Sequence, residues 1–372
     1  MLRPVNGARH HRGVLTSMAT AANSLASNGH LFFEGTEKLL EVWFTNCDDE
    51  GADLRAIERP FWDQLLANVQ CVILAKKSLG GMDAYILSES SMFVSKNRFI
   101  LKTCGSTTLL KSIKPLLLEA TEKCGFEVMD LFYSRKNFMK PELQHNIHQT
   151  FDDEVCHLDE SFENGAAYAL GRLNGECWYF YTIDTLGVME PDQTLEISFC
   201  KHSKVITVWK RSYGLKMSHY SFQKSGISKL VPGSVIDAYL FDPYGYSCNG
   251  LLEDDHYFTI HVTPQPNCSY VSFETNVPQD DFKVMIEHVL DCFRPGKFLV
   301  TLFANKASRA SDSLNAFKVD NPVPGYCNQD WQHSKFRNYD LLYAHFMKPR
   351  FRTPSDTEPA LVQWKKPHKI VD

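Results

Sequence analysis

The residues most suggestive of chemistry surround Ser90. A polar run, residues 88–91, lies between two short apolar segments, 85–87 and 98–101, that both favour strands. The Ser90 hydroxyl is one residue beyond the carbonyl of Glu89, and in a strained turn it could attack that carbonyl and convert the amide into an ester. Loss of the α-proton would then cut the chain and leave a ketone, a pyruvoyl group. Most polar runs of this kind are exposed serine-rich turns without a chemical role.

Longer motifs around this turn resemble the eukaryotic S-adenosylmethionine decarboxylases. They are LSESSMFVSK and LKTCG at the turn, FFEGTEKLLEVWF before it, and YSRKNFMKP, PDQTLEI, PGSVIDAYLF, GYSCNG, TIHVTP and YVSFETN after it. The resemblance runs in order from about residue 32 to about residue 305 and does not include the first thirty residues or the final stretch.

This resemblance implies a self-cleaving enzyme that converts S-adenosylmethionine into its decarboxylated form and CO2, and so supplies the aminopropyl donor for spermidine and spermine synthesis. The cofactor would be a covalent pyruvoyl group made from Ser90, without pyridoxal phosphate. Cleavage between Glu89 and Ser90 would give fragments 1–89 and 90–372. A metal is not expected, because Cys and His residues show no zinc-ligand spacing.

Three further residues match catalytic or processing positions of the family. Cys104, in LKTCG, would protonate the carbanion left by CO2, although most free cysteines are small buried hydrophobes. Ser247 and His261 match the processing residues, and a lone strand histidine such as His261 is more often structural. The residues Gly245 and Asn249-Gly250 predict a tight turn that presents Ser247.

The resemblance also implies a binding site for an adenosine that carries a sulfonium cation. Phe33 and Phe241 match the adenine-stacking pair, and Leu87 is a further predicted contact. Glu34 and Glu37 match acidic residues of the active site, where carboxylates next to a cation are physically reasonable. Judged on sequence alone, such aromatics are more often core residues, and Glu37 could lie on a solvated helix face.

Three positions depart from the family pattern. Gln265 stands where the family has a glutamate that contacts the ribose, so a charge-assisted hydrogen bond is lost and weaker substrate binding is expected. Asp242 and Tyr244 also differ, beside Phe241. These departures concern affinity rather than reaction type.

A second acidic set comprises Asp192, Glu196 and Glu274. In the animal enzymes that the chain resembles, such residues bind putrescine as an activator, and carboxylates buried together need a cation. Glu41 and Lys102 are predicted outer members of the set. A solvated sheet edge is the alternative.

Composition narrows the class of protein. A net charge of −5 argues against nucleic-acid binding, and no apolar run approaches the eighteen residues that suggest a membrane span. Eleven cysteines, an odd number without a CxxC pair, favour a reduced compartment, so we expect the cytosol. Residues 1–30 carry arginines and no acids, which indicates a disordered extension or, as the lesser alternative, a mitochondrial presequence.

Strand hairpins dominate the remaining chain. Segments 71–76 and 82–87 join across two glycines, and 166–172 and 176–183 join over Asn-Gly. Other predicted strands are 126–133, 193–199, 234–241, 257–262, 269–273 and 297–303, and helices are predicted within 60–66, 107–123, 152–162 and 280–293. Thr36 is predicted to cap another helix, over 39–44, with Glu37 and Glu41 on one face.

This pattern is α+β with antiparallel sheets. The resemblance implies a duplicated four-layer α/β/β/α sandwich over residues 31–348 as one domain, with a loose tail at 349–372. A faint echo, FFEGT and SFETN, each leading towards a predicted helix, agrees with duplication.

Two alternatives to the enzyme stay open. A non-catalytic regulatory relative would lack the reactive serine, whereas Ser90, Cys104, Ser247 and His261 are all present. A relative that binds nucleoside without cleaving itself is supported by Gln265. Processed units could also pair as a homodimer.

Overall fold

The computed structural model describes residues 32–45, 51–183, 192–200, 226–241, 245–264, 269–311 and 323–349. The chain divides into two compact units, Met1–Glu34 and Gly35–Asp372, and every element below belongs to the second.

The first sheet of this unit has eight antiparallel strands in the order β2-β3-β4-β5-β1-β6-β8-β7. Most neighbours in the sheet are also neighbours in sequence, as expected for a fold made of hairpins. The strands are β1 (Lys38–Thr45), β2 (Ile73–Leu79), β3 (Met82–Leu87), β4 (Ser90–Val94), β5 (Arg98–Thr103), β6 (Glu127–Lys136), β7 (Gly165–Gly171) and β8 (Cys177–Ile183).

The second sheet repeats this arrangement in the order β10-β11-β12-β13-β9-β14-β16-β15. Adding eight to each strand number of the first sheet gives the second, so the two halves are duplicates. The strands are β9 (Gln193–Cys200), β10 (Val235–Leu240), β11 (Tyr246–Leu251), β12 (Tyr257–Thr263), β13 (Tyr270–Thr275), β14 (Lys297–Asn305), β15 (Cys327–Lys335) and β16 (Tyr339–Met347).

The predicted duplication is confirmed, but the sequence echo that suggested it does not align the two halves. FFEGT precedes β1, whereas SFETN covers the end of β13, the counterpart of β5, and the residue after it. The true counterparts are β1 and β9, which read KLLEVWFT and QTLEISFC. The last hairpin, β15 and β16, was not predicted, because its polar β15 lacks the apolar alternation of a half-buried strand.

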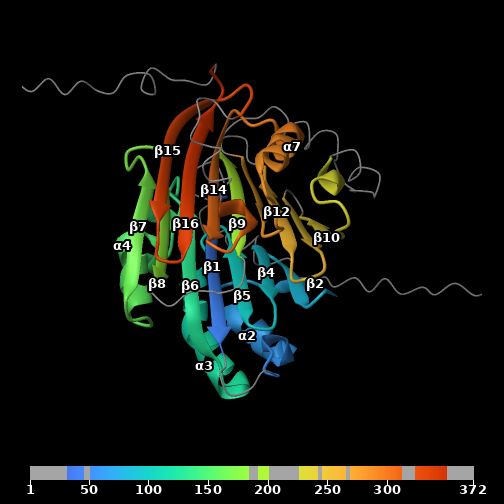
Figure 1. Cartoon of the computed structure of the whole chain (residues 1–372). Helices are drawn as coiled ribbons and strands as arrows, with labels where there is room; N and C mark the ends of the chain where they lie inside the picture. The colour runs from blue at the N-terminus through green and yellow to red at the C-terminus, as the bar shows by residue number, and fades with distance from the viewer. Residues whose placement is uncertain are drawn as a thin grey trace, which may run out of the picture. The chain divides into compact units, whose positions relative to one another are not determined.

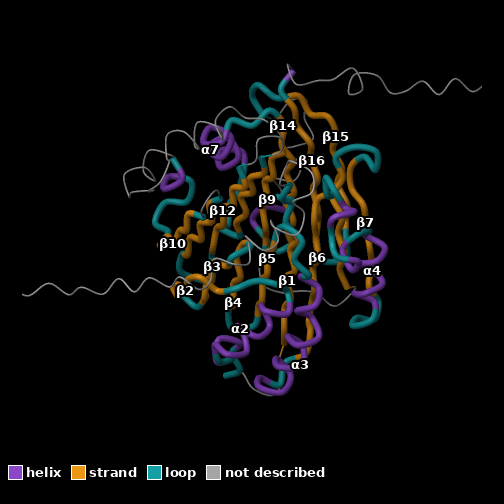
Figure 2. The backbone as a smooth tube through the Cα atoms, turned by 180° about the vertical axis from the view of Figure 1, so that it is seen from behind, coloured by secondary structure: helices purple, strands orange, loops and turns teal. Residues whose placement is uncertain are grey.

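Helices cover the outer faces of both sheets, as the four-layer prediction requires (Figures 1 and 2). On the first sheet they are α2 (Arg59–Asn68), α3 (Ile113–Cys124) and α4 (Phe151–Asp159), and on the second α7 (Lys283–Phe293). Trp62, Leu116 and Leu158 join the core of the first sheet, while Ile286 and Val289 join that of the second. Each helix therefore buries one apolar face on its own sheet.

The helix predicted over 39–44 is wrong, because these residues form β1. Leu40 and Val42 face the helices, while Glu41 and Trp43 face the other sheet. A strand with neighbours on both edges and both faces buried reads as a continuous apolar run, which periodicity cannot distinguish from a buried helix. Glu37 and Glu41 still share a direction, since residues four apart in extended backbone point to the same face.

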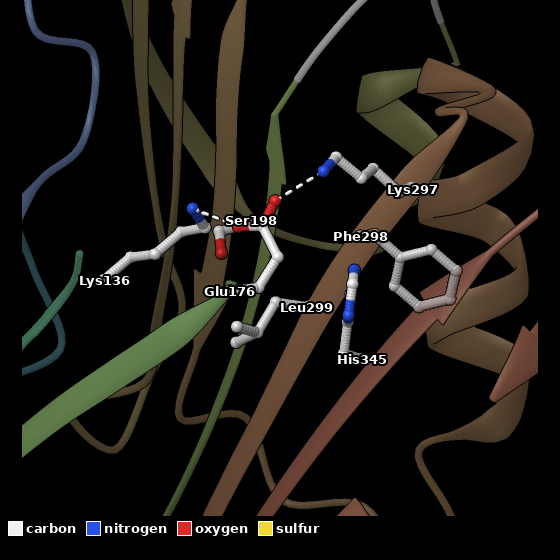
Figure 3. Close-up of a pocket in the computed structure, with 7 residues that line it drawn as sticks. All are labelled: Lys136, Glu176, Ser198, Lys297, Phe298, Leu299 and His345. Carbon is white, nitrogen blue, oxygen red and sulfur yellow. Dashed lines mark hydrogen bonds and ion pairs between the residues drawn. The ribbon is translucent and has the colours of Figure 1, made fainter. Parts of the chain in front are cut away.

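The space between the sheets contains buried ions as well as aromatics. Glu176, just before β8, accepts from Lys297 of β14 at 2.6 Å and also pairs with Lys136 of β6 (Figure 3). These three side chains line a cavity of about 250 Å³. Lys136 belongs to the first sheet and Lys297 to the second, so the ion pairs of Glu176 connect the two sheets.

Candidate active site at the Glu89–Ser90 bond

The Glu89–Ser90 bond lies at a tight hairpin between β3 and β4. Leu87 pairs with Ser90 in the ladder, so Ser88 and Glu89 alone form the turn. Ser90 has φ of 136°, a backbone conformation that side-chain-bearing residues rarely adopt. Such strain is worth on the order of 1–3 kcal/mol, and here it falls on the bond predicted to break.

Two donors from Cys104 contact the Glu89 carbonyl oxygen. The Cys104 backbone N–H donates to it at 3.0 Å, and the thiol lies 3.4 Å from the same oxygen. Donors on one carbonyl oxygen stabilise the negative charge that develops there when a nucleophile attacks. Burial raises the pKa of the Cys104 thiol well above its usual range, and the nearby carboxylates of Glu89 and Glu37 raise it further, so the thiol keeps its proton.

The Ser90 hydroxyl is bound by an acid and a histidine. It donates to Glu37 Oε1 at 2.8 Å and lies 3.2 Å from Nδ1 of His261, which itself contacts Glu37 Oε1 at 2.6 Å. Burial alone would raise the pKa of Glu37, but the charges of His261 and Lys102 outweigh it and hold that pKa well below its usual range. Glu37 is therefore an ionised acceptor beside the predicted nucleophile.

Ser247 and Asn249-Gly250 lie within β11 rather than in a turn, so the predicted turn is wrong. Ser247 pairs directly with His261 of β12, which places both side chains on the face towards the first sheet. Gly250 is required for packing instead, since an added Cβ would lie 2.0 Å from Cε1 of Phe258. Close packing against the Phe258 ring, rather than a turn, is the reason for glycine at position 250.

Asn249, Thr259 and Ser91 complete the site and were not predicted. Asn249 Oδ1 accepts from Ser91 Oγ at 2.8 Å and from Thr259 Oγ1 at 2.9 Å, and Ser91 Oγ lies 2.8 Å from Nε2 of His261. Asn249 and Thr259 are two residues from Ser247 and His261. Strand alternation puts them on the same face, and this signal would have found them.

Lys102 connects this site to the second acidic set. Its Nζ lies 2.6 Å from Glu274 Oε2, 3.5 Å from Glu37 Oε2 and 3.7 Å from Glu196 Oε1. Burial by itself would lower the pKa of Lys102, but the three carboxylates raise it, so the lysine remains charged.

The three predicted members of the acidic set lie between the sheets rather than at a solvated edge. Glu196 and Glu274 are direct partners in the β9–β13 ladder, and Asp192 lies 3.8 Å from Arg98, which binds Glu41 at 2.6 Å. Burial raises the pKa of Glu41 and of Glu196 to about 7 and also raises the pKa of Asp192.

Asp130 of β6 is an acid of this region that was not predicted. Burial and the charges of Glu41 and Asp192 raise its pKa to about 7. These acids outnumber the cations Arg98 and Lys102 that contact them, and their raised pKa values mean that several of them hold protons near neutral pH.

Of the remaining predicted residues, Leu87 adjoins this bond as the ladder partner of Ser90. Leu87 is fully buried in the core under the helices, and Phe241 is half-buried beyond β10, with its ring 4.9 Å from that of Tyr239. Phe33 and Glu34 belong to the first unit. Gln265, Asp242 and Tyr244 lie outside the described residues. Their roles stay predictions.

Within the described ranges, no group of three or more His, Cys, Asp or Glu side chains is arranged to hold a metal ion. No helix among the same residues has the length and apolar character needed to cross a membrane.

Comparisons with known proteins agree on one family. Residues 30–347 match the family model described as adenosylmethionine decarboxylase. The S-adenosylmethionine decarboxylase proenzyme of Xenopus laevis is 47% identical over 324 residues, covering 85% of this chain and 96% of that protein. The proenzyme of Drosophila melanogaster is 43% identical over 340 residues, covering 87% and 97%. The fold is similar to a Trypanosoma brucei AdoMetDC-delta26 monomer, with a TM-score of 0.55 and 24% identity, covering 69% of this chain and 98% of that one.

Proposed function

Because the chain belongs to the adenosylmethionine decarboxylase family, we propose that it cuts itself between Glu89 and Ser90 and then decarboxylates S-adenosylmethionine. The products are CO2 and decarboxylated S-adenosylmethionine, the aminopropyl donor for spermidine and spermine. The observation that carries the proposal is the strained Ser90, whose hydroxyl donates to ionised Glu37 while Cys104 binds the neighbouring carbonyl.

Self-cleavage follows from these contacts in two steps. In the first, the Ser90 hydroxyl loses its proton and attacks the carbonyl carbon of Glu89, with the developing oxyanion stabilised by the Cys104 N–H and thiol. The carbon–nitrogen bond then breaks, and the amide becomes an ester that relieves the strain at Ser90.

In the second step, a base removes the α-proton of Ser90. The ester oxygen leaves with the Glu89 carboxyl, and the nitrogen-bearing end of the larger fragment loses ammonia by hydrolysis to become a pyruvoyl group. His261 is the proposed base, since its ring lies 3.2–3.3 Å from Ser90 Oγ, and Ser247 is its neighbour across the ladder.

The side chains around the new N-terminus, at residue 90, are suited to catalysis by a pyruvoyl group. Its carbonyl would supply the electron sink for decarboxylation. Cys104, held as a protonated thiol beside residue 90, is the proposed proton donor to the product carbon. Phe33, Phe241, Leu87 and Gln265 remain the proposed substrate contacts, and Glu34 remains a proposed catalytic acid.

Putrescine is the proposed activator at Asp192, Glu196 and Glu274. A diamine would neutralise the excess of buried carboxylates there. Lys102 contacts Glu274 and Glu37 at once, so the diamine would act on the Ser90 site through a continuous chain of charges. We further propose that the protein is cytosolic. We also propose that processed units can pair as a homodimer, and sedimentation of the processed protein distinguishes this from a monomer.

Intact-mass analysis of the purified protein tests the proposal. We expect fragments 1–89 and 90–372, the larger with an N-terminus that is blocked until its ketone is reduced. A single 42.5 kDa chain with unmodified Ser90 would refute self-cleavage and favour the non-processing relative.

The matched control is Ser90→Ala, which removes only the hydroxyl and should remain uncut. Release of CO2 from carboxyl-labelled S-adenosylmethionine should accompany cleavage and be absent from this variant. Cleavage without CO2 release would contradict the assigned substrate.

A further inference from the structure

Asn249 is a buried amide whose orientation the surrounding atoms determine. It is 1% exposed in β11, and its Nδ2 donates to the backbone carbonyl of Tyr85 at 3.2 Å. A carbonyl oxygen can only accept, so the amide end that faces Tyr85 must be the NH2 group. The opposite end is then Oδ1, and the hydroxyls of Ser91 and Thr259, at 2.8 and 2.9 Å, must both donate to it.

This arrangement determines where the protons of His261 lie. Each hydroxyl has one proton, and in both Ser91 and Thr259 that proton is directed at Asn249. Nε2 of His261 lies 2.8 Å from Ser91 Oγ and 3.3 Å from Thr259 Oγ1, so both oxygens can only accept from it. Nε2 therefore carries a proton.

The other ring nitrogen carries a proton as well. Nδ1 of His261 lies 2.6 Å from Glu37 Oε1, and an ionised carboxylate can only accept. With a proton on each nitrogen the ring is an imidazolium and has no lone pair to accept the proton of Ser90. The remaining acceptor in contact with the Ser90 hydroxyl is Glu37, at 2.8 Å.

We infer that Asn249 is a positioning residue of self-cleavage, which directs the hydroxyls of Ser91 and Thr259 so that His261 is held as an imidazolium and Glu37 takes the Ser90 proton. The inference rests on the proposed self-cleavage and adds to it an order of proton transfers.

The protons balance in this order. Glu37 takes the hydroxyl proton as the bond from Ser90 Oγ to the Glu89 carbonyl carbon forms. When the carbon–nitrogen bond breaks, the nitrogen of residue 90 takes a proton from the imidazolium of His261. The ring is then neutral, and it can act as the base that removes the α-proton in the second step. One histidine thus serves first as acid and then as base, without any outside reactant.

The test is the pH dependence of the first-order cleavage rate in freshly refolded precursor. The unsubstituted chain should cleave more slowly at alkaline pH, because the first step needs a proton donor for the nitrogen of residue 90. Other charged or titratable groups of the neighbouring elements also shape this profile: Glu37 ahead of β1, Glu89 and Cys104 beside Ser90, Lys102 on β5 and Glu274 on β13.

Two substitutions of Asn249 should move this alkaline limb in opposite directions. In Asn249→Ala the hydroxyls are released and can donate to Nε2, so the rate should fall about tenfold or more and the limb should shift to lower pH. In Asn249→Asp one carboxylate oxygen still accepts both hydroxyls and the added negative charge favours the imidazolium, so the limb should shift to higher pH, while the lost hydrogen bond to the Tyr85 carbonyl should lower stability.

Asn276→Ala is the matched control. Asn276, just after β13, is also a buried amide, and its side chain binds backbone groups, the N–H of Tyr257 at 2.7 Å and the carbonyl of Asp255 at 3.0 Å. Its loss should lower stability without moving the limb. If the alkaline limb of the rate profile stays in place in the Asn249 variants, or moves in the same direction in both, the inference is overturned. Self-cleavage itself would not be refuted by that result.

A second measurement does not depend on the folding of any Asn249 variant. In the uncut Ser90→Ala chain, nitrogen-15 resonances of His261 should show both ring nitrogens protonated at pH 7. A neutral ring there would also overturn the inference. An unsubstituted chain that never cleaves would instead refute the proposed function.

Discussion

At the scale of single residues, the site works by keeping ordinary groups in unusual protonation states. The Cys104 thiol stays protonated and Glu37 stays ionised although both are buried. The difference lies in their partners, since Cys104 faces carboxylates and Glu37 faces cations. A proton donor and a proton acceptor can therefore coexist within contact of one peptide bond.

Cys104→Ala should separate the two reactions. The backbone N–H of residue 104 still donates to the Glu89 carbonyl, so cleavage should slow but continue. Decarboxylation should fall by about 10²- to 10⁴-fold, because the proton donor to the product carbon is lost. Fragment analysis and CO2 release measure the two effects, and unchanged turnover per processed chain would reject the role.

At the scale of elements, strand pairing decides which groups meet. β11 and β12 place Ser247 opposite His261, and β9 and β13 place Glu196 opposite Glu274. Like charges directly opposite in a ladder are destabilising. The fold tolerates the second pair because Lys102 reaches both carboxylates from β5 of the other sheet.

Gly250→Ala should disturb β11 by overpacking. The new Cβ would lie 2.0 Å from Cε1 of Phe258, whose side chain is fully buried in the core under α7. We expect a loss of unfolding free energy of about 1–3 kcal/mol and slower self-cleavage, since Ser247 and Asn249 share the strand. Urea unfolding in the uncut Ser90→Ala background measures the first effect. Gly175→Ala is the control for an added methyl, because the nearest atom to its Cβ position is 3.5 Å away, an ordinary van der Waals contact.

The acids of β9 and β13 should make the protein respond to diamines. If putrescine binds only the folded chain, it should raise stability by about 2.7 kcal/mol at a hundredfold excess over its dissociation constant. Much of this gain should survive added salt, because buried charge pairs are screened less than exposed ones. Thermal melts with and without putrescine measure it.

Asp192→Asn should abolish most of that shift. A native melt that putrescine leaves unmoved, with unmoved turnover, would mean that the acids bind no diamine. A shift that persists in full in Asp192→Asn would place the diamine elsewhere in the molecule.

At the scale of the whole second unit, the two duplicated sheets are joined by ion pairs at two places. Lys102 connects the halves near Ser90, and the Lys136–Glu176–Lys297 group, drawn in Figure 3, connects them beside His345. His345 of β16 lies beside this second group, 9% exposed, and its Nε2 has no hydrogen-bond partner in the described structure. A charged ring there would lose its hydration and face Lys136 and Lys297, and these effects together outweigh the favourable charge of Glu176.

His345 should therefore weaken the fold in acid. Burial lowers its pKa from 6.5 to about 4, so the unfolded chain binds a proton at a higher pH than the folded chain does. Stability from this group is present above pH 6.5 and is lost progressively as the pH falls towards 4. Between pH 7 and pH 5 the loss should be about 2 kcal/mol.

His345→Leu should remove that part of the acid sensitivity, because leucine cannot titrate. Urea unfolding of Ser90→Ala chains at pH 7 and pH 5, with and without the second substitution, measures the difference. An equal loss in both chains would assign the acid sensitivity to other groups.

Much of this molecule could be read from the sequence because its signals are local. Hairpin glycines and strand alternation predicted β2 with β3, β7 with β8, and β12, and long motifs predicted Ser90, Cys104, Glu37 and His261 as one functional set. These features depend on neighbours along the chain, where residue type alone limits the backbone.

Tertiary structure decided what depends on burial and on partners distant in sequence. Residues 39–44 became β1 because both faces are covered, which removes the alternation that marks a strand. Gly250 serves the Phe258 ring rather than a turn, and Asn249 meets Ser91 from 158 residues away. The hydroxyl protons of Ser91 and Thr259 are directed at Asn249 only after the two sheets have packed together. The inferred charge of His261 therefore depends on tertiary structure.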